Sequence, residues 1–168
     1  MTDQEVHIAD YDPAWPSRFE AERELLQQAI GGWVVDGIHH IGSTSVPRLA
    51  AKPVIDIMAG DADLESSRPC IEALGALQYL YAPYRADVEH WFCKPDPSYR
   101  THHLHLVPTG SPRYRDALVL RDFLRTHYDV AAQYGELKRS LATRFRADRD
   151  AYTDAKAEFV TAVLARAG

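Results

Sequence analysis

The stretch HIGSTSVPRLAAKPVIDI, residues 40–57, joins two apolar runs through a short segment of glycine and hydroxyl residues. The first run is followed directly by Gly42, Ser43, Thr44 and Ser45. A turn of this composition at the end of a strand brings backbone N–H groups and hydroxyl donors together, and such a concavity suits a phosphate or another anion. The stretch therefore predicts a strand, an anion-binding turn and a second strand.

Two charged residues lie further along the same stretch. Lys52 adds a compact positive charge near the turn. Asp56 lies between Ile55 and Ile57, so strand alternation points it away from the apolar layer of the two isoleucines. An ionised carboxylate in the middle of a sheet costs free energy unless it is paired or bound to a metal. Two interpretations stay open: a structural ion pair of Asp56 with Lys52 or an arginine, or a functional site.

A second polar cluster occurs in THHLHLVP, residues 101–108. Its histidines His103 and His105 are two residues apart, so they share one face of a strand. Two imidazoles in this arrangement can bind a metal or act as acid and base, although buried, hydrogen-bonded histidines give the same pattern. If Asp56 lies on a neighbouring strand, all three side chains belong to one candidate site. Three further cations are candidates for phosphate binding on this face, although each alone is commonly solvated or ion-paired: Lys94, Arg100 and Arg121.

The composition limits the function classes. The 168 residues are 46% hydrophobic and 26% charged, as expected for one globular domain over residues 1–168. The formal net charge of −5 argues against general binding to nucleic acid or to an anionic membrane, and no apolar run approaches the roughly 18 residues of a membrane span. Cys70 and Cys93 form no CxxC pair, so we expect reduced thiols in a cytoplasmic protein.

Apolar spacing, with the positions of proline and glycine, predicts an α+β fold whose strands precede residue 108. The expected helices span residues 12–30 and 64–75 and recur from residue 112 to the end of the chain. The expected strands cover residues 5–9, 33–41, 53–58, 78–82, 88–94 and 103–107.

The segment at residues 40–57 resembles the signature of the GrpB family of nucleotidyltransferase-like proteins. The resemblance extends from about residue 7 to about residue 165, and it departs from the family at Arg48, where a glycine is usual. Further matching positions lie on both sides of the signature: Tyr11-Asp12-Pro13, Trp15-Pro16, His103-Leu104-His105, Arg121-Asp122-Phe123-Leu124-Arg125, Tyr134, Lys138, Tyr152 and Lys156.

The resemblance implies a nucleotidyltransferase-like mixed sheet with packed helices and a helical C-terminal region. In that superfamily a Gly-Ser turn, here Gly42 and Ser43, holds a triphosphate. Three carboxylates hold two metal ions, and Asp56 matches the first of them. The second position is Met58, and the third falls near the histidines at 103 and 105, so the set that a two-metal mechanism requires is incomplete.

Three functions remain open at this point, and whether the protein is an enzyme stays open with them. The first is a nucleotidyl- or phosphoryl-transfer enzyme for a small phosphate-containing substrate, with Asp56 and His105 as catalytic residues. The second is a catalytically silent module that binds a nucleotide or another anion. The third is a metal-dependent hydrolase with Asp56, His103 and His105 as ligands. Carboxylate and phosphate oxygens would hold Mg²⁺, and imidazoles would favour Mn²⁺ or Zn²⁺.

Overall fold

The computed structural model describes residues 4–168 and contains a mixed five-stranded sheet in the order β1-β2-β5-β4-β3. Strands β2 and β5 are parallel, and the other neighbouring pairs are antiparallel. Residues 1–3 of the expected domain lie outside the described part of the chain. The strands are β1 Ile38–Ile41, β2 Ile55–Asp61, β3 Leu80–Ala82, β4 His90–Asp96 and β5 Tyr99–Pro108. The expected α+β class with a mixed sheet is confirmed.

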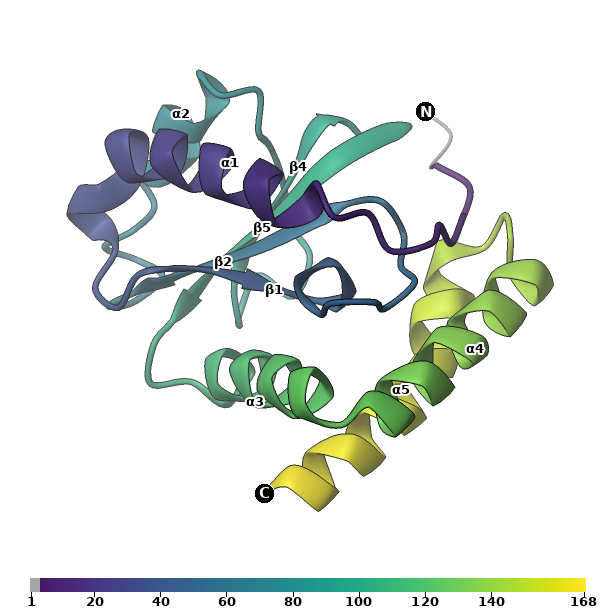
Figure 1. The fold of residues 1–168 in the computed structure, drawn as a ribbon. Helices are drawn as coiled ribbons and strands as arrows, with labels where there is room; N and C mark the ends of the chain where they lie inside the picture. Colours follow the sequence, from purple (N-terminus) through teal and green to yellow (C-terminus); the bar gives the residue numbers. More distant parts are fainter. Residues whose placement is uncertain (1–3) are drawn as a thin grey trace.

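Helices cover both faces of this sheet (Figure 1). Figure 1 shows α1 and α2 over one face and α3 under the other, with α4 and α5 running beside the end of the sheet. The helices are α1 Trp15–Ile30, α2 Cys70–Gly75, α3 Pro112–Thr126, α4 Tyr128–Arg144 and α5 Arg149–Ala167. No helix in residues 4–168 combines the length and apolar composition that a bilayer span requires.

The main hydrophobic core lies between α1 and the sheet. Phe19, Leu26 and Ile30 of α1 follow helical spacing, so they lie on one side of the helix and are buried. They belong to the same buried cluster as Ile57 of β2 and Leu104 of β5. Burial of this face fixes the orientation of both strands, and Asp56, His103 and His105 must then project from the opposite face.

The C-terminal helices pack on the connection between β1 and β2. Val46 and Leu49 of this connection are buried in one cluster with Leu124 of α3, Tyr134 of α4 and Val163 of α5. The helices α4 and α5 therefore close over the turn that the sequence marks as an anion site.

Several element boundaries differ from the sequence predictions. Residues 5–9 form no strand, and only an isolated bridge from Ala9 to Ala51 pairs this segment. The strand expected at 33–41 begins at Ile38, because a 3₁₀ turn over Gly31–Trp33 and Gly37 with a φ of 107° precede it.

The other shifts concern elements that begin later or extend further than expected. Strand β2 starts after Pro53 and continues to Asp61, because residues 59–61 keep pairing with β5. Helix α2 covers only the second half of the expected 64–75, since residues 64–69 form turns. Strand β5 is longer than the expected 103–107 because its first residues pair with β4 as a hairpin.

Candidate functional site

The turn after β1 is built around Gly42. Its φ is 70°, and residues Ser43–Ser45 then form a 3₁₀ turn. The Ser45 hydroxyl donates to the Gly42 carbonyl at 2.5 Å, and Thr44 Oγ1 lies 2.9 Å from His40 Nε2. Thr44 and Ser45 are buried, and their hydroxyls stabilise the turn itself. Ser43 and Thr44 line a cavity and Ser45 does not, so anion binding by this turn stays a prediction.

Gly42 also lies directly against Asp56. The antiparallel register pairs Ile41 with Asp56, and a Cβ added to Gly42 would lie 2.6 Å from Asp56 Oδ2. Any side chain at position 42 would therefore collide with the carboxylate and strain the backbone. Glycine is required here for two independent reasons.

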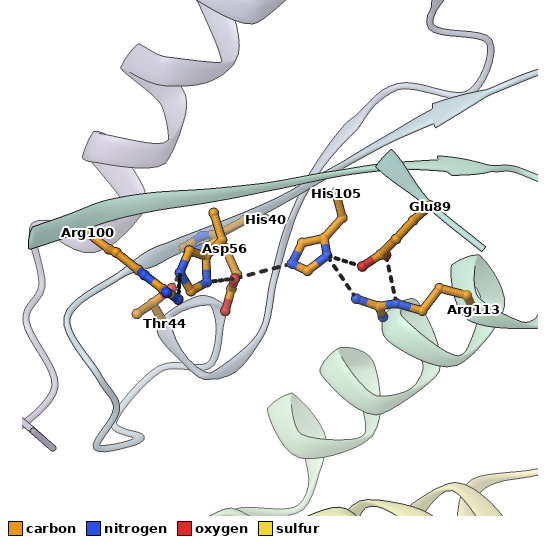
Figure 2. Close-up of polar contacts among 8 residues, drawn as sticks. His40, Thr44, Asp56, Glu89, Arg100, His105 and Arg113 are labelled. Atoms are coloured by element: carbon orange, nitrogen blue, oxygen red, sulfur yellow. Dashed lines mark hydrogen bonds and ion pairs between the residues drawn. The ribbon is translucent and has the colours of Figure 1, made fainter. Parts of the chain in front are cut away.

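Asp56 meets both expected histidines on the neighbouring strand (Figure 2). The parallel register places Asp56 beside His103 and Met58 beside His105. Asp56 Oδ1 lies 3.3 Å from His103 Nδ1 and 3.5 Å from His105 Nε2, and its side chain stays 30% exposed. The partners of Asp56 are therefore imidazoles, rather than the lysine or arginine of the ion-pair alternative.

Electrostatics shift the pKa values of the two histidines in opposite directions. Burial opposes the charge of Asp56, but hydrogen bonds and charges from His103 and His105 outweigh it and hold the Asp56 pKa well below its usual range. Burial lowers the pKa of His103 to about 4, so this ring is neutral at pH 7. Burial also opposes the charge of His105, but its bonds to Asp56 and Glu89 raise its pKa.

Glu89 and Arg113 extend this cluster beyond the residues that the sequence indicated. His105 Nδ1 donates to Glu89 Oε1 at 3.1 Å, and Arg113 Nε donates to Glu89 Oε2 at 3.2 Å (Figure 2). Glu89 is only 2% exposed, so its carboxylate holds the His105 ring from a fixed position. The result is a continuous line of contacts from Asp56 through His105 to Glu89.

A cavity of about 220 Å³ opens beside Asp56, and three lysines line it. Lys52 follows the turn, Lys138 comes from α4 and Lys156 from α5; the chain has only one further lysine. Their Nζ atoms lie over tyrosine rings of the same cavity, at 5.3 Å for Lys52 and 5.1 Å for Lys156 over Tyr152, and at 4.7 Å for Lys138 over Tyr134. Three of the four lysines in the chain thus converge on one cavity.

These lysines have no carboxylate partner, since none of them forms a salt bridge within residues 4–168. Burial and the charges of Lys156 and Arg149 lower the pKa of Lys52 to about 7. Burial and the charges of Lys156 and Lys52 lower the pKa of Lys138 to about 6. The cavity therefore has an excess of positive potential that an anion would relieve.

The two expected arginines take different positions. Arg121 lines the lysine cavity, and its Nη1 donates to the His40 carbonyl at 3.3 Å. Arg100 lines a second, wider groove of about 800 Å³, where its Nη1 lies 3.4 Å from His103 Nε2. The groove and the cavity share part of their walls, including Gly42, Lys52, Asp56, His103 and Lys156. Asp56 thus lies where the two spaces meet.

Lys94 does not join this site, which corrects its assignment to the phosphate-binding set. It pairs with His102 across β4 and β5, so it faces α1 on the opposite side of the sheet. Its Nζ lies 2.5 Å from Glu22 Oε1, and the Tyr79 hydroxyl donates to the same oxygen at 2.8 Å. Strand alternation put Lys94 on the face opposite to His103, and its charge is neutralised there.

Comparison with known proteins gives the family. The GrpB protein family matches residues 5–166. The chain belongs to the GrpB family. This confirms the family resemblance that the segment at residues 40–57 indicated.

Relatives of this GrpB chain include a UPF0157 protein of Pseudomonas aeruginosa, 38% identical over 98% of this chain and 69% of the relative. The crystal structure of the conserved protein GrpB from Enterococcus faecalis superposes with a TM-score of 0.86 at 31% identity, covering 96% of both chains. A longer protein of Mycolicibacterium paratuberculosis, named dephospho-CoA kinase, is 29% identical over 90% of this chain but only 43% of its own length.

The most informative residues that sequence reasoning left out of the site are the lysines and tyrosines of α4 and α5. A signal for them exists in the GrpB sequence, because YGELK at 134–138 and YTDAK at 152–156 repeat one spacing. Residues four apart lie on the same side of a helix, so each tyrosine lies next to its lysine. The repeat alone gives no indication that both pairs face one cavity. Glu89 has no comparable signal.

The expected divalent-metal ligands do not form a ready metal site. Within residues 4–168 no group of three or more His, Cys, Asp and Glu side chains is arranged to hold a metal ion. The imidazoles of His103 and His105 instead contact Asp56 Oδ1 directly. Metal binding by these three residues therefore stays a prediction.

Proposed function

We propose that this protein binds a small phosphate-containing substrate in the lysine cavity and transfers a phosphoryl or nucleotidyl group at Asp56. The observation that carries the proposal is the convergence of Lys52, Lys138 and Lys156 on one cavity without a carboxylate partner. Lys138 is buried and the other two lysines are half-buried, and such a cluster destabilises a fold through desolvation and mutual repulsion. Phosphate oxygens would remove both costs when the substrate binds.

The cavity also offers an apolar surface beside its charges. Leu120, Leu124 and Val160 line it together with the two tyrosine rings. A ligand with both phosphates and an apolar or aromatic part, such as a nucleotide, fits this combination of walls. Inorganic phosphate alone would leave the apolar wall uncovered.

The wider groove favours transfer over simple binding. Because the cavity and the groove meet at Asp56, a donor in the cavity and an acceptor in the groove would meet at this carboxylate. The acceptor oxygen forms a bond to phosphorus while the bond to the leaving phosphate oxygen breaks. Asp56, which its low pKa keeps ionised, accepts a hydrogen bond from the acceptor hydroxyl and takes its proton as the new bond forms, while His105, whose pKa is raised, donates to the Asp56 carboxylate and holds it in place.

One relative supports a phosphate-containing substrate. The Mycolicibacterium paratuberculosis protein that matches this chain over part of its length is named dephospho-CoA kinase, a name that describes phosphoryl transfer. This likeness concerns the substrate class only.

Binding is tested by calorimetric titration of ATP and of pyrophosphate into the native chain and its lysine variants. We expect Lys52→Ala and Lys138→Met each to weaken binding about tenfold or more, which corresponds to about 1.4 kcal/mol or more. Arg115→Ala is the matched control, because Arg115 is 72% exposed and pairs with its neighbour Asp116. Equal affinity in the lysine variants and the native chain would contradict the proposal.

Transfer is tested separately by ³¹P NMR of bound ATP with water as the acceptor. Release of pyrophosphate indicates nucleotidyl transfer, and release of ADP indicates phosphoryl transfer. Asp56→Asn should abolish the release while pyrophosphate still binds at the lysines. Tight binding without release in the native chain would leave the silent binding module as the function.

A further inference from the structure

One polar group in the lysine cavity has no partner. Tyr152 of α5 is 0% exposed and lines the cavity, and its hydroxyl forms no hydrogen bond within residues 4–168. Most buried polar atoms in folded proteins are hydrogen-bonded, so an exception requires an explanation. Leaving a buried hydroxyl unsatisfied costs about 1–3 kcal/mol.

The ring of Tyr152 is held in place from several sides. It belongs to a buried cluster with Val6, Ile8, Leu141 and Ala142. Two lysine Nζ atoms of the cavity also lie over the ring, within 5.3 Å of its centroid. The hydroxyl therefore cannot reach solvent by a simple rotation of the side chain.

The surroundings of this hydroxyl determine what it can bind. Burial raises the pKa of Tyr152, so the hydroxyl keeps its proton and acts as a donor. The lysines of the same cavity are donors as well, and Lys138 already donates to the Ala50 carbonyl at 2.5 Å. A partner for this group of donors must be an acceptor with several free lone pairs, and phosphate oxygens meet that requirement.

We propose that the Tyr152 hydroxyl donates a hydrogen bond to a phosphate oxygen of the bound substrate, which makes Tyr152 a specificity-determining residue of the cavity. The inference rests on the proposed function and goes beyond it, because it assigns a neutral donor next to the charged ones. A neutral donor adds direction to the binding of phosphate, whereas the lysines add mainly charge.

The chain contains a matched control in Tyr79. Its hydroxyl is also buried, but it donates to Glu22 at 2.8 Å on the other side of the sheet. Replacing either tyrosine by phenylalanine removes one oxygen atom and keeps the ring. Tyr79→Phe removes a formed bond, whereas Tyr152→Phe removes an unsatisfied group.

The experiment measures pyrophosphate affinity by calorimetry and thermal stability without ligand for Tyr152→Phe and Tyr79→Phe. We expect Tyr152→Phe to weaken pyrophosphate binding about tenfold, as for a hydrogen bond to a charged group, with an unchanged or raised Tm. Tyr79→Phe should lower the Tm and leave the affinity unchanged. The factor lost in Tyr152→Phe should also be the same at pH 6 and pH 9, because the phenol does not titrate in this range.

Two results would overturn the inference while the proposed function stands. In the first, Tyr152→Phe binds pyrophosphate normally although Lys138→Met does not. In the second, Tyr152→Phe lowers the Tm as Tyr79→Phe does, which would assign the hydroxyl a structural partner such as a buried water. If no variant changes the affinity, the lysine cavity itself is not the phosphate site, and the proposed function fails.

Discussion

The two faces of the sheet use the same residue types in opposite ways. On the α1 face, Lys94 lies against Glu22, and the Tyr79 ring lies 4.9 Å from its Nζ. On the α4–α5 side, Lys138 lies over the ring of Tyr134 with a backbone carbonyl as its hydrogen-bond acceptor. Both lysines are largely buried, and only one of them has a carboxylate partner.

This difference separates a structural charge from a functional one. A lysine with a carboxylate partner keeps its charge at little cost to the fold, and its surroundings are complete without a ligand. The charge of Lys156 instead raises the cost of charging both Lys52 and Lys138. Titratable groups that lie in a cleft and have strongly shifted pKa values are found preferentially at functional sites. The difference between the paired Lys94 and the lysines of the cavity, which are unpaired within residues 4–168, therefore indicates that the cavity is the functional site.

The largest expected effect comes from Lys94→Met. This change leaves the buried Glu22 carboxylate without its cation, and breaking a buried ion pair costs about 3–5 kcal/mol. Lys138→Met should change the free energy of unfolding by less than about 1 kcal/mol, because relief of the charge offsets the lost bond to the Ala50 carbonyl. Urea unfolding of both variants measures the difference. Equal destabilisation would remove the distinction between the two faces.

Asp56→Asn should have an intermediate effect. It removes the negative charge that both histidines contact, and hydrogen bonds to a charged group contribute about 1.5–3 kcal/mol. Because the folded state holds the pKa of Asp56 below its usual value of 3.8, the stabilisation is fully present above that pH. It is lost as the pH falls through the lower, folded-state pKa.

The measurement for Asp56→Asn is the urea midpoint at pH 7 and at pH 3, compared with the native chain. The gap between the two proteins should shrink at the lower pH. If the difference in urea midpoint were the same at both pH values, the negative charge of Asp56 would contribute nothing to the stability of the fold.

The smallest expected effect is the uptake of a fraction of a proton when pyrophosphate binds. Burial and Lys156 lower the pKa of Lys52 to about 7 from 10.5, so at pH 8 this lysine is largely neutral when the cavity is empty. Pyrophosphate restores its charge, and binding at pH 8 should therefore take up part of a proton. Calorimetry in buffers of different ionisation enthalpy measures the uptake.

When pyrophosphate binds at pH 8, the Lys52→Met variant should take up a smaller fraction of a proton than the native chain does. The Arg115→Ala variant should take up the same fraction as the native chain. Between pH 7 and about 10 Lys52 binds fewer protons in the folded chain than in the unfolded one, so its contribution to the native stability should also rise over this range. Proton release on binding would contradict the lowered lysine pKa.

The sequence by itself determined the sheet face on which the candidate residues lie. Strand alternation is a local property of the backbone, so Asp56, His103 and His105 could be placed opposite the apolar layer before any pairing was known. Helical spacing likewise indicated the C-terminal helices, although the start of β1 was missed because a 3₁₀ turn has no strong pattern.

Only the tertiary structure decided which residues meet. The register of β2 against β5 brings Asp56 next to the histidines, and the packing of α4 and α5 on Val46 and Leu49 brings two distant lysines to Lys52. Such contacts depend on burial between segments far apart in the chain, and no local pattern encodes them. The same long-range pairing gave Lys94 a partner in Glu22 and left the hydroxyl of Tyr152 without a hydrogen bond among residues 4–168.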